Sequence, residues 1–159
     1  MIDLSLLFNW LFQTGVAFLA TITFAIIFHT PRREWLFCGI TGGLGWLVYL
    51  ICMSADMGAV ASSFFATLAL AWISRIFAFC RKTPVTVFLI SGIFPLVPGA
   101  GIYYTGYNVF MSDNAQALAK GMETIKIAVA IALGIGIVLS LPAFFFTLHR
   151  SRGKSGKQS

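Results

Sequence analysis

Residues 94–106 read FPLVPGAGIYYTG, and their types and spacing could bind a polar ligand. The two prolines each remove a backbone donor and clash with the preceding helical turn, and the glycines allow backbone conformations that other residues avoid. Backbone N–H and C=O groups are then left without helical partners beside side-chain hydroxyls, and such groups can hydrogen-bond a carboxylate. The candidate ligand-binding or pathway residues of this stretch are Pro95, Pro98, Gly99, Gly101, Tyr103, Tyr104 and Thr105.

This stretch interrupts an apolar run at a depth that can be calculated. From Pro84 to Phe94 a helix would rise about 16 Å, which is half of the roughly 30 Å hydrocarbon core of a bilayer. Unpaired backbone groups at the bilayer midplane must be buried in protein or face water. A second half-helix, beginning near Ala100, would direct its N-terminal N–H groups at the break and could seat a carboxylate. A proline kink that only shapes packing is the alternative.

The elements that position this stretch are long apolar runs. The chain has 159 residues, 58% of them hydrophobic and 10% charged, and a mean hydropathy of +0.89, which a soluble fold cannot accommodate. Helices are the spanning element that such runs allow. We expect an all-α, polytopic membrane domain over residues 1–149, its fourth helix broken at PLVPG, and a disordered basic tail over 150–159. The five predicted spans are Leu4–Phe28, Leu36–Ser54, Ala59–Phe79, Pro84–Phe110 and Ile127–Leu148.

Basic residues predict how these spans are oriented. Nine of the eleven Lys and Arg residues lie near the exits of the first, third and last spans, and Lys120 and Lys126 lie on the other side. By the positive-inside rule, the N-terminus is outside and the C-terminus is cytoplasmic. The first run has no basic residue before it and no small-residue cleavage site, which predicts a retained helix rather than a secretory signal.

Small residues recur every fourth position on two of the spans, which is typical of close helix packing in membranes. The second span adds a GxxxG pair, Gly39 and Gly43. These rows predict either a compact five-helix unit or docking against helices of another chain, so we expect a homo-oligomer or a hetero-complex. The two rows are Ala59, Ser63, Thr67 and Ala71 on the third span, and Ala128, Ala132, Gly136 and Ser140 on the fifth.

Three further polar residues are candidates for function. Arg75 lies about one turn inside the end of the third span, where it could snorkel to the interface or pair with a ligand carboxylate or a partner's acid. Asp113 can cap a helix that continues into the fifth span, with Gln116 at the reciprocal position of a capping box. Glu123 lies three residues from Lys120 and from Lys126, which predicts a solvated ion-pair cluster. We keep Asp113 and Glu123 as candidate coupling or gating residues.

Catalysis, cofactors and nucleic acid find no support in the sequence. The cysteines Cys38, Cys52 and Cys80 lie in or beside apolar runs without metal-site spacing, and we interpret them as packing residues. A membrane enzyme would need clustered nucleophiles and bases, whereas His29 and His149 stand alone. The net charge of +6 is spread over loops rather than gathered on one face. We therefore expect no enzyme, no metal or cofactor, and no nucleic-acid partner.

The order of these motifs resembles the smaller half of the bacterial threonine/serine exporter family. This resemblance implies a subunit, in the cell membrane of a bacterium, that works with a larger membrane protein of the same family to export threonine, serine or a related carboxylate such as succinate. A non-transporting assembly subunit is the alternative. The matching residues are Arg75, Pro84, FPLVPGAGIYY at 94–104, Asp113, Gly121, Glu123, Thr124 and AIALGI at 130–135, with PRR at 31–33 and GGLGW at 42–46.

Overall fold

The computed structural model describes residues 4–141, which form helices and turns without a strand in that range. By length and composition, four helices can cross a membrane, and the bent pair of α4 and α5 brings the number to five if it counts as one span. The predicted all-α, multi-pass architecture with a broken fourth span is confirmed. The helices are α1 (Leu4–Ile27), η1 (Arg32–Glu34), α2 (Trp35–Ser54), α3 (Gly58–Arg81), α4 (Val85–Ile93), η2 (Phe94–Leu96), α5 (Gly99–Phe110) and α6 (Asn114–Ser140).

The last helix begins well before the fifth apolar run. α6 starts at Asn114, where the side chain of Asp113 accepts a hydrogen bond of 3.1 Å from the Gln116 backbone N–H. The predicted cap is therefore confirmed, but its reciprocal half is not, because the Asp113 N–H donates to the Asn108 carbonyl instead. The end of the fifth run after Leu141 and the predicted tail, 150–159, lie outside the described residues.

Four of the turns between helices contain a residue in the left-handed conformation. His29, Asp56, Lys82 and Ser112 have φ values of 54°, 54°, 53° and 59°. Each directly or nearly follows the end of a helix, where this conformation stops the helical hydrogen-bond pattern. None of them is glycine, so the usual sequence signal for such a turn is missing, and sequence analysis did not identify these residues.

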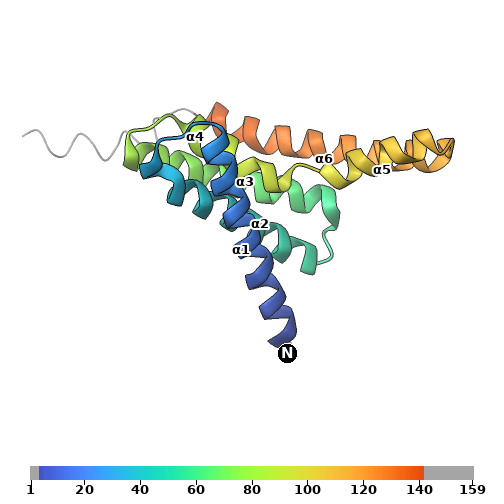
Figure 1. Ribbon diagram of the computed structural model, residues 1–159, viewed down its shortest axis with the longest axis horizontal. Helices are drawn as coiled ribbons and strands as arrows, with labels where there is room; N and C mark the ends of the chain where they lie inside the picture. Colours follow the sequence, from blue (N-terminus) through green and yellow to red (C-terminus); the bar gives the residue numbers. More distant parts are fainter. Residues whose placement is uncertain (1–3, 142–159) are drawn as a thin grey trace, which may run out of the picture.

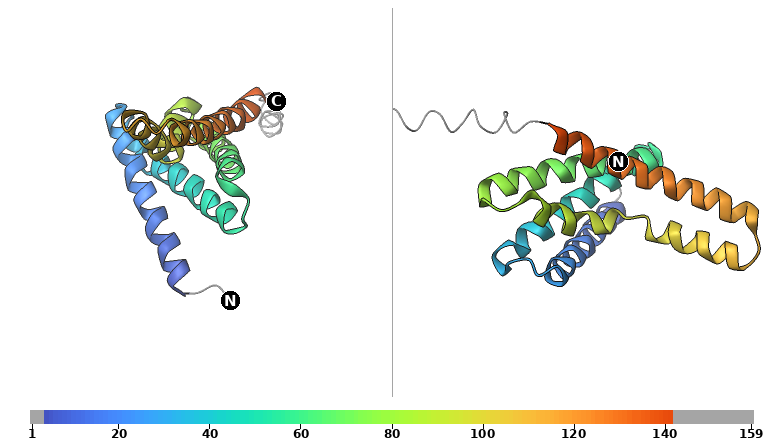
Figure 2. Two further views of the ribbon diagram at one scale, coloured as in Figure 1. Left: turned by 90° about the vertical axis from the view of Figure 1, so that its right-hand side faces the viewer. Right: turned by 90° about the horizontal axis from the view of Figure 1, so that it is seen from above.

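The helices separate into two parts. α2 packs against α1, α3 and α4, and α3 also packs against α6, whereas α5 packs mainly against α6. Figures 1 and 2 show that α5 and the adjoining part of α6 extend beyond the other helices, and that the first half of α1 extends away in another direction. We call α1–α4 with residues 128–140 of α6 the helical body, and α5 with residues 114–127 of α6 the α5–α6 hairpin.

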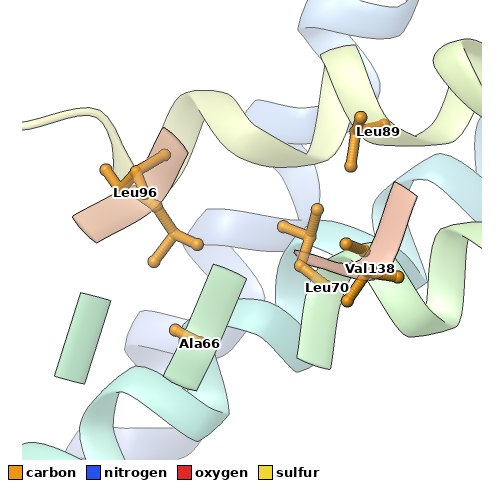
Figure 3. Packing of buried hydrophobic residues seen from close by; sticks show 7 residues of the cluster. Ala66, Leu70, Leu89, Leu96 and Val138 are labelled. Carbon is orange, nitrogen blue, oxygen red and sulfur yellow. The ribbon is translucent and has the colours of Figure 1, made fainter. Parts of the chain in front are cut away.

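Close backbone approaches hold the helical body together. A side chain at Gly42 of α2 would clash with the Thr21 hydroxyl of α1. A Cβ at Gly134 of α6 would lie 3.0 Å from the Phe64 carbonyl oxygen of α3. A cluster of buried apolar side chains from α3, α4, η2 and α6 packs together in the body (Figure 3). That cluster consists of Ala66, Leu70, Ala71, Leu89, Leu96, Ile131 and Val138.

The two predicted rows of small residues have different surroundings. On α3, Ser63, Thr67 and Ala71 are buried inside the chain. On α6, the row of Ala128, Ala132, Gly136 and Ser140 is exposed, and a Cβ at Gly136 would meet nothing within 4 Å. The α3 row therefore serves packing within this chain, and the α6 row faces outward.

Candidate functional site

The break in the fourth span is five residues long. α4 ends at Ile93, one turn of 3₁₀-helix follows in η2, and Val97 is extended with φ −61° and ψ 129°. α5 then begins at Gly99 after Pro98, and its first backbone bond runs from the Ile102 N–H to the Pro98 carbonyl. The two helices are bent by 49° at this break. Both predicted glycines of the break lie inside α5, so neither is needed for an unusual backbone conformation.

A cavity of about 380 Å³ lies beside the break. Side chains of α2 and α3 form one side of it, the break and the first turn of α5 form another, and the first half of α6 forms the third. Polar and apolar groups share its wall. The lining residues are Trp46, Tyr49, Ser63, Pro95, Leu96, Val97, Pro98, Gly99, Ala100, Gly101, Tyr104, Lys120, Glu123, Thr124 and Ile127.

The cavity contains some, but not all, of the residues selected from the sequence. Its wall includes Pro95, Pro98, Gly99, Gly101, Tyr104 and Glu123. Its lining does not include Tyr103, Thr105, Arg75 or Asp113. The binding role of the first group stays a prediction, and the position of the second group has a physical explanation in each case.

Tyr103 lies on the outward face of α5. Its side chain is 65% exposed, and its ring contacts the rings of Tyr104 and Tyr107 at centroid distances of 5.4 and 6.4 Å. Neighbouring helical residues point about 100° apart. Of the two adjacent tyrosines, only Tyr104 is among the residues that line the cavity.

Thr105 is part of a reciprocal contact between α5 and α6. A side chain at Gly101 would clash with Thr124, and a Cβ at Gly121 would lie 3.3 Å from the Thr105 methyl group. Each threonine hydroxyl donates to the carbonyl four residues earlier, Thr105 to Gly101 and Thr124 to Lys120, both at 2.7 Å. Each glycine thus makes room for a threonine of the other helix, which fixes the α5–α6 hairpin.

Arg75 lies at the far end of α6 instead of in the cavity. Its guanidinium Nη1 donates to the Val138 carbonyl and, at 2.8 Å, to the Leu141 carbonyl. The last carbonyls of a helix have no intrahelical donors, so this cation caps α6. The predicted roles of Arg75, snorkelling to the interface or pairing with a ligand carboxylate or a partner's acid, stay predictions. Asp113, the other residue outside the cavity, caps the start of the same helix.

The ion pair predicted around Glu123 forms with Lys120. The Lys120 Nζ lies 3.0 Å from the Glu123 Oε2, and both side chains are about half exposed. Among the described residues, Glu123 makes this pair with Lys120 and not with Lys126. Sequence analysis treated the pair as solvated surface, and it is indeed exposed, but both members also lie on the cavity wall.

Trp46 is the most informative residue that sequence analysis missed. Its ring stacks on Tyr49 at a centroid distance of 5.1 Å, and its indole N–H is buried without an acceptor among the described residues. Together with Pro95 it also lines a second, mostly apolar cavity beside α1. A buried donor without an acceptor is costly unless a ligand or water accepts from it. The sequence signal that could have identified Trp46 as a cavity residue was its position in the GGLGW motif, since a tryptophan side chain combines an apolar ring with one hydrogen-bond donor.

Comparisons with known proteins agree with this architecture. The family described as "Threonine/Serine exporter, ThrE" matches residues 13–141. An uncharacterized protein of Haemophilus influenzae is 26% identical over 100 residues, 63% of this chain and 32% of that protein. A probable threonine/serine exporter of Mycobacterium tuberculosis is 27% identical over 115 residues, 72% of this chain and 22% of that protein.

These two relatives are much longer than the part that aligns with this chain. The chain spans about a third or less of the length of these curated relatives. No solved structure matches it. In the described residues there is no group of three or more His, Cys, Asp or Glu side chains that could hold a metal ion. Because the family match covers most of the sequence, the chain belongs to the threonine/serine exporter family.

Proposed function

We propose that this chain is a membrane subunit of a small-solute exporter and that the cavity at the break of the fourth span receives the solute. The observation that carries this proposal is the broken span itself, which opens on a cavity whose wall includes polar and charged side chains among apolar ones. Within a membrane, an interrupted helix is tolerated where its backbone is covered by protein or lines a water-filled space. A solute path satisfies that requirement.

The proposed solute is threonine, serine or a related small carboxylate such as succinate. The family to which the chain belongs and the name of the mycobacterial relative support an amino-acid solute. The first turn of α5 lies on the cavity wall, and free N–H groups at a helix start favour a carboxylate. No cofactor is part of this proposal.

We also propose that a larger membrane subunit of the same family completes the exporter in the cell membrane. The chain corresponds to a minor part of its relatives, and the outward row of small residues on α6 offers a surface for another helix. A second copy of this chain is the alternative partner. The N-terminus is proposed to be outside and the C-terminus cytoplasmic, from the distribution of basic residues.

Efflux from preloaded cells tests this proposal. Cells that express this chain together with the larger half should export threonine, serine or succinate, and cells that express it alone should not. Gly99→Leu should abolish export with assembly intact, because Gly99 lines the cavity and its Cβ position is open. Gly106→Leu is the matched control: it lies on the same helix, has open space, and is not among the lining residues.

A structural subunit without a transport path is the second candidate function. The exposed row on α6 favours it, since that row is suited to docking whether or not a solute passes. Normal efflux with Gly99→Leu, in a complex that still co-purifies with the larger half, would favour this candidate and count against the solute cavity.

A further inference from the structure

We propose that Lys120 and Glu123 determine the solute specificity of the cavity, by selecting a solute that carries both a carboxylate and an ammonium group over a carboxylate that lacks the ammonium group. This inference rests on the proposed function, because it assumes that the cavity receives the exported solute. It assigns Lys120 to the carboxylate and Glu123 to the ammonium group.

The charge of the cavity wall is the first argument. Lys120 and Glu123 are the charged residues among those that line it. The charges of these two side chains cancel, but together they offer one group of each sign. A zwitterion can pair with both, whereas the second carboxylate of a dicarboxylate would meet the like charge of Glu123.

The accessibility of the pair is the second argument. Both side chains are about half exposed, and they are three residues apart on one helix. Exposed pairs of this kind are weak, so a solute can separate the two charges at little cost. The other ion pair in the described residues, Glu34 with Arg81, is different, because the Glu34 side chain is only 8% exposed.

The surroundings of the pair assign the two roles. The carbonyl of Lys120 is fixed by the Thr124 hydroxyl, and Thr124 fits against Gly101 in the first turns of α5. The N–H groups of Ala100 and Gly101 precede the first α-helical bond of α5, and both residues line the same cavity, so they add positive potential to its wall. The buried indole N–H of Trp46 is a further donor that lacks an acceptor among the described residues. A carboxylate is therefore favoured beside Lys120, which leaves Glu123 for the ammonium group.

Ligand stabilisation of the full chain in lipid nanodiscs provides the test. The probes are L-threonine and 3-hydroxybutyrate, which lacks the amino group, and the measurement is the concentration of each that raises the unfolding temperature half-maximally. The wild type should respond to L-threonine at about tenfold lower concentration, which is the size expected of one charge-assisted hydrogen bond. Glu123→Gln should remove this preference, and Lys120→Gln should weaken the response to both probes.

Two further variants separate recognition from structure. Lys126→Gln is the matched control, because Lys126 lies on the same helix, is exposed, and does not line the cavity; its response should equal that of the wild type. The double variant Lys120→Glu with Glu123→Lys keeps an ion pair but exchanges the charges. It should remain folded, and its half-maximal L-threonine concentration should rise, because the two charges are exchanged while the N–H donors of Ala100 and Gly101 stay in place on the cavity wall.

Each outcome bears on either the inference or the proposed function. If L-threonine does not stabilise the wild type, or if Glu123→Gln keeps the full preference for L-threonine, the inference is overturned. If Glu123→Gln removes the preference for L-threonine as expected, but the complex shows no efflux from preloaded cells, the role of Lys120 and Glu123 in ligand recognition is supported and the proposed export function is contradicted. If the complex exports the solute but Glu123→Gln keeps the full preference for L-threonine over 3-hydroxybutyrate, export is supported and the proposed role of Lys120 and Glu123 is overturned.

Discussion

The helical body and the α5–α6 hairpin use the same kinds of interaction for different ends. In the body, Arg81 binds both carboxylate oxygens of Glu34 across 47 residues of sequence, and its guanidinium also lies 4.6 Å from the Phe37 ring. In the hairpin, Lys120 binds Glu123 one helical turn away, with both side chains half exposed. The first pair ties distant segments together, and the second leaves its charges accessible.

Glycine packing shows the same difference. In the body, Gly42 brings α2 against α1, and Gly134 brings α6 against α3. In the hairpin, Gly101 and Gly121 bring α5 against α6, but α5 itself contains no buried residue. The body is thus packed against itself, and the hairpin is held in place beside a cavity. This comparison indicates that stability resides mainly in the body and ligand contact mainly at the hairpin.

The largest effect is expected from the closest approach in the body. Gly42→Ala should destabilise the chain by about 1–3 kcal/mol or more, because the added methyl group clashes with the Thr21 hydroxyl of α1. Gly15→Ala on α1 is the control, since its Cβ would meet nothing within 4 Å, and it should be neutral or stabilising by up to about 1 kcal/mol. Thermal unfolding in detergent measures both. Equal unfolding temperatures would contradict the packing of α1 on α2.

A pair of Glu→Gln variants compares the two regions directly. Glu34→Gln should lower the free energy of unfolding by roughly 1–3 kcal/mol, because the neutral amide replaces the buried carboxylate and the Arg81 guanidinium loses its ion-pair partner. Glu123→Gln should change the free energy of unfolding by less than about 0.5 kcal/mol, since exposed pairs within a helix contribute little. Thermal unfolding of both variants in the same detergent is the measurement. A larger loss for Glu123→Gln would reverse the assignment of stability to the body.

Arg75 provides a prediction at the border of the body. Arg75→Gln should loosen the last turn of α6, because the carbonyls of Val138 and Leu141 lose the hydrogen bonds from the Arg75 guanidinium. We expect faster amide hydrogen exchange at that end of α6 and a loss of about 1–2 kcal/mol. The preference between L-threonine and 3-hydroxybutyrate should not change. If Arg75→Gln changes the preference for L-threonine but leaves amide hydrogen exchange at the end of α6 unchanged, Arg75 acts as a ligand-binding residue rather than as a helix cap.

The sequence was sufficient for features that depend on local signals. The spans, the break at PLVPG and the Asp113 cap follow from run length, proline chemistry and fixed capping distance, and the structure contains all three. The left-handed turns at His29 and Lys82 were missed because they lack glycine.

The composition of the cavity could be predicted only in part, and the reason is the solvent. In water, apolar residues mark the face of a helix that turns inward, but lipid is as apolar as a protein core. The sequence therefore identifies residues that share a face without indicating which neighbour that face meets. Tyr103 was expected in the site and points outward, Arg75 caps α6, and Trp46 and Lys120 line a cavity to which they were not assigned.

The smallest expected effect separates the two adjacent tyrosines of α5. Tyr104 lines the cavity and Tyr103 is 65% exposed on the outward face. Removing a neutral hydrogen bond costs about 0.5–1.5 kcal/mol, so Tyr104→Phe should raise the half-maximal L-threonine concentration by about two- to tenfold, and Tyr103→Phe should leave it unchanged. Both variants keep the ring, so packing against Tyr107 and the stability of the hairpin should be preserved. If Tyr103→Phe has the larger effect, α5 is rotated relative to the cavity in the ligand-bound state. The break, where the two helices are bent by 49°, would then be the hinge of that rotation.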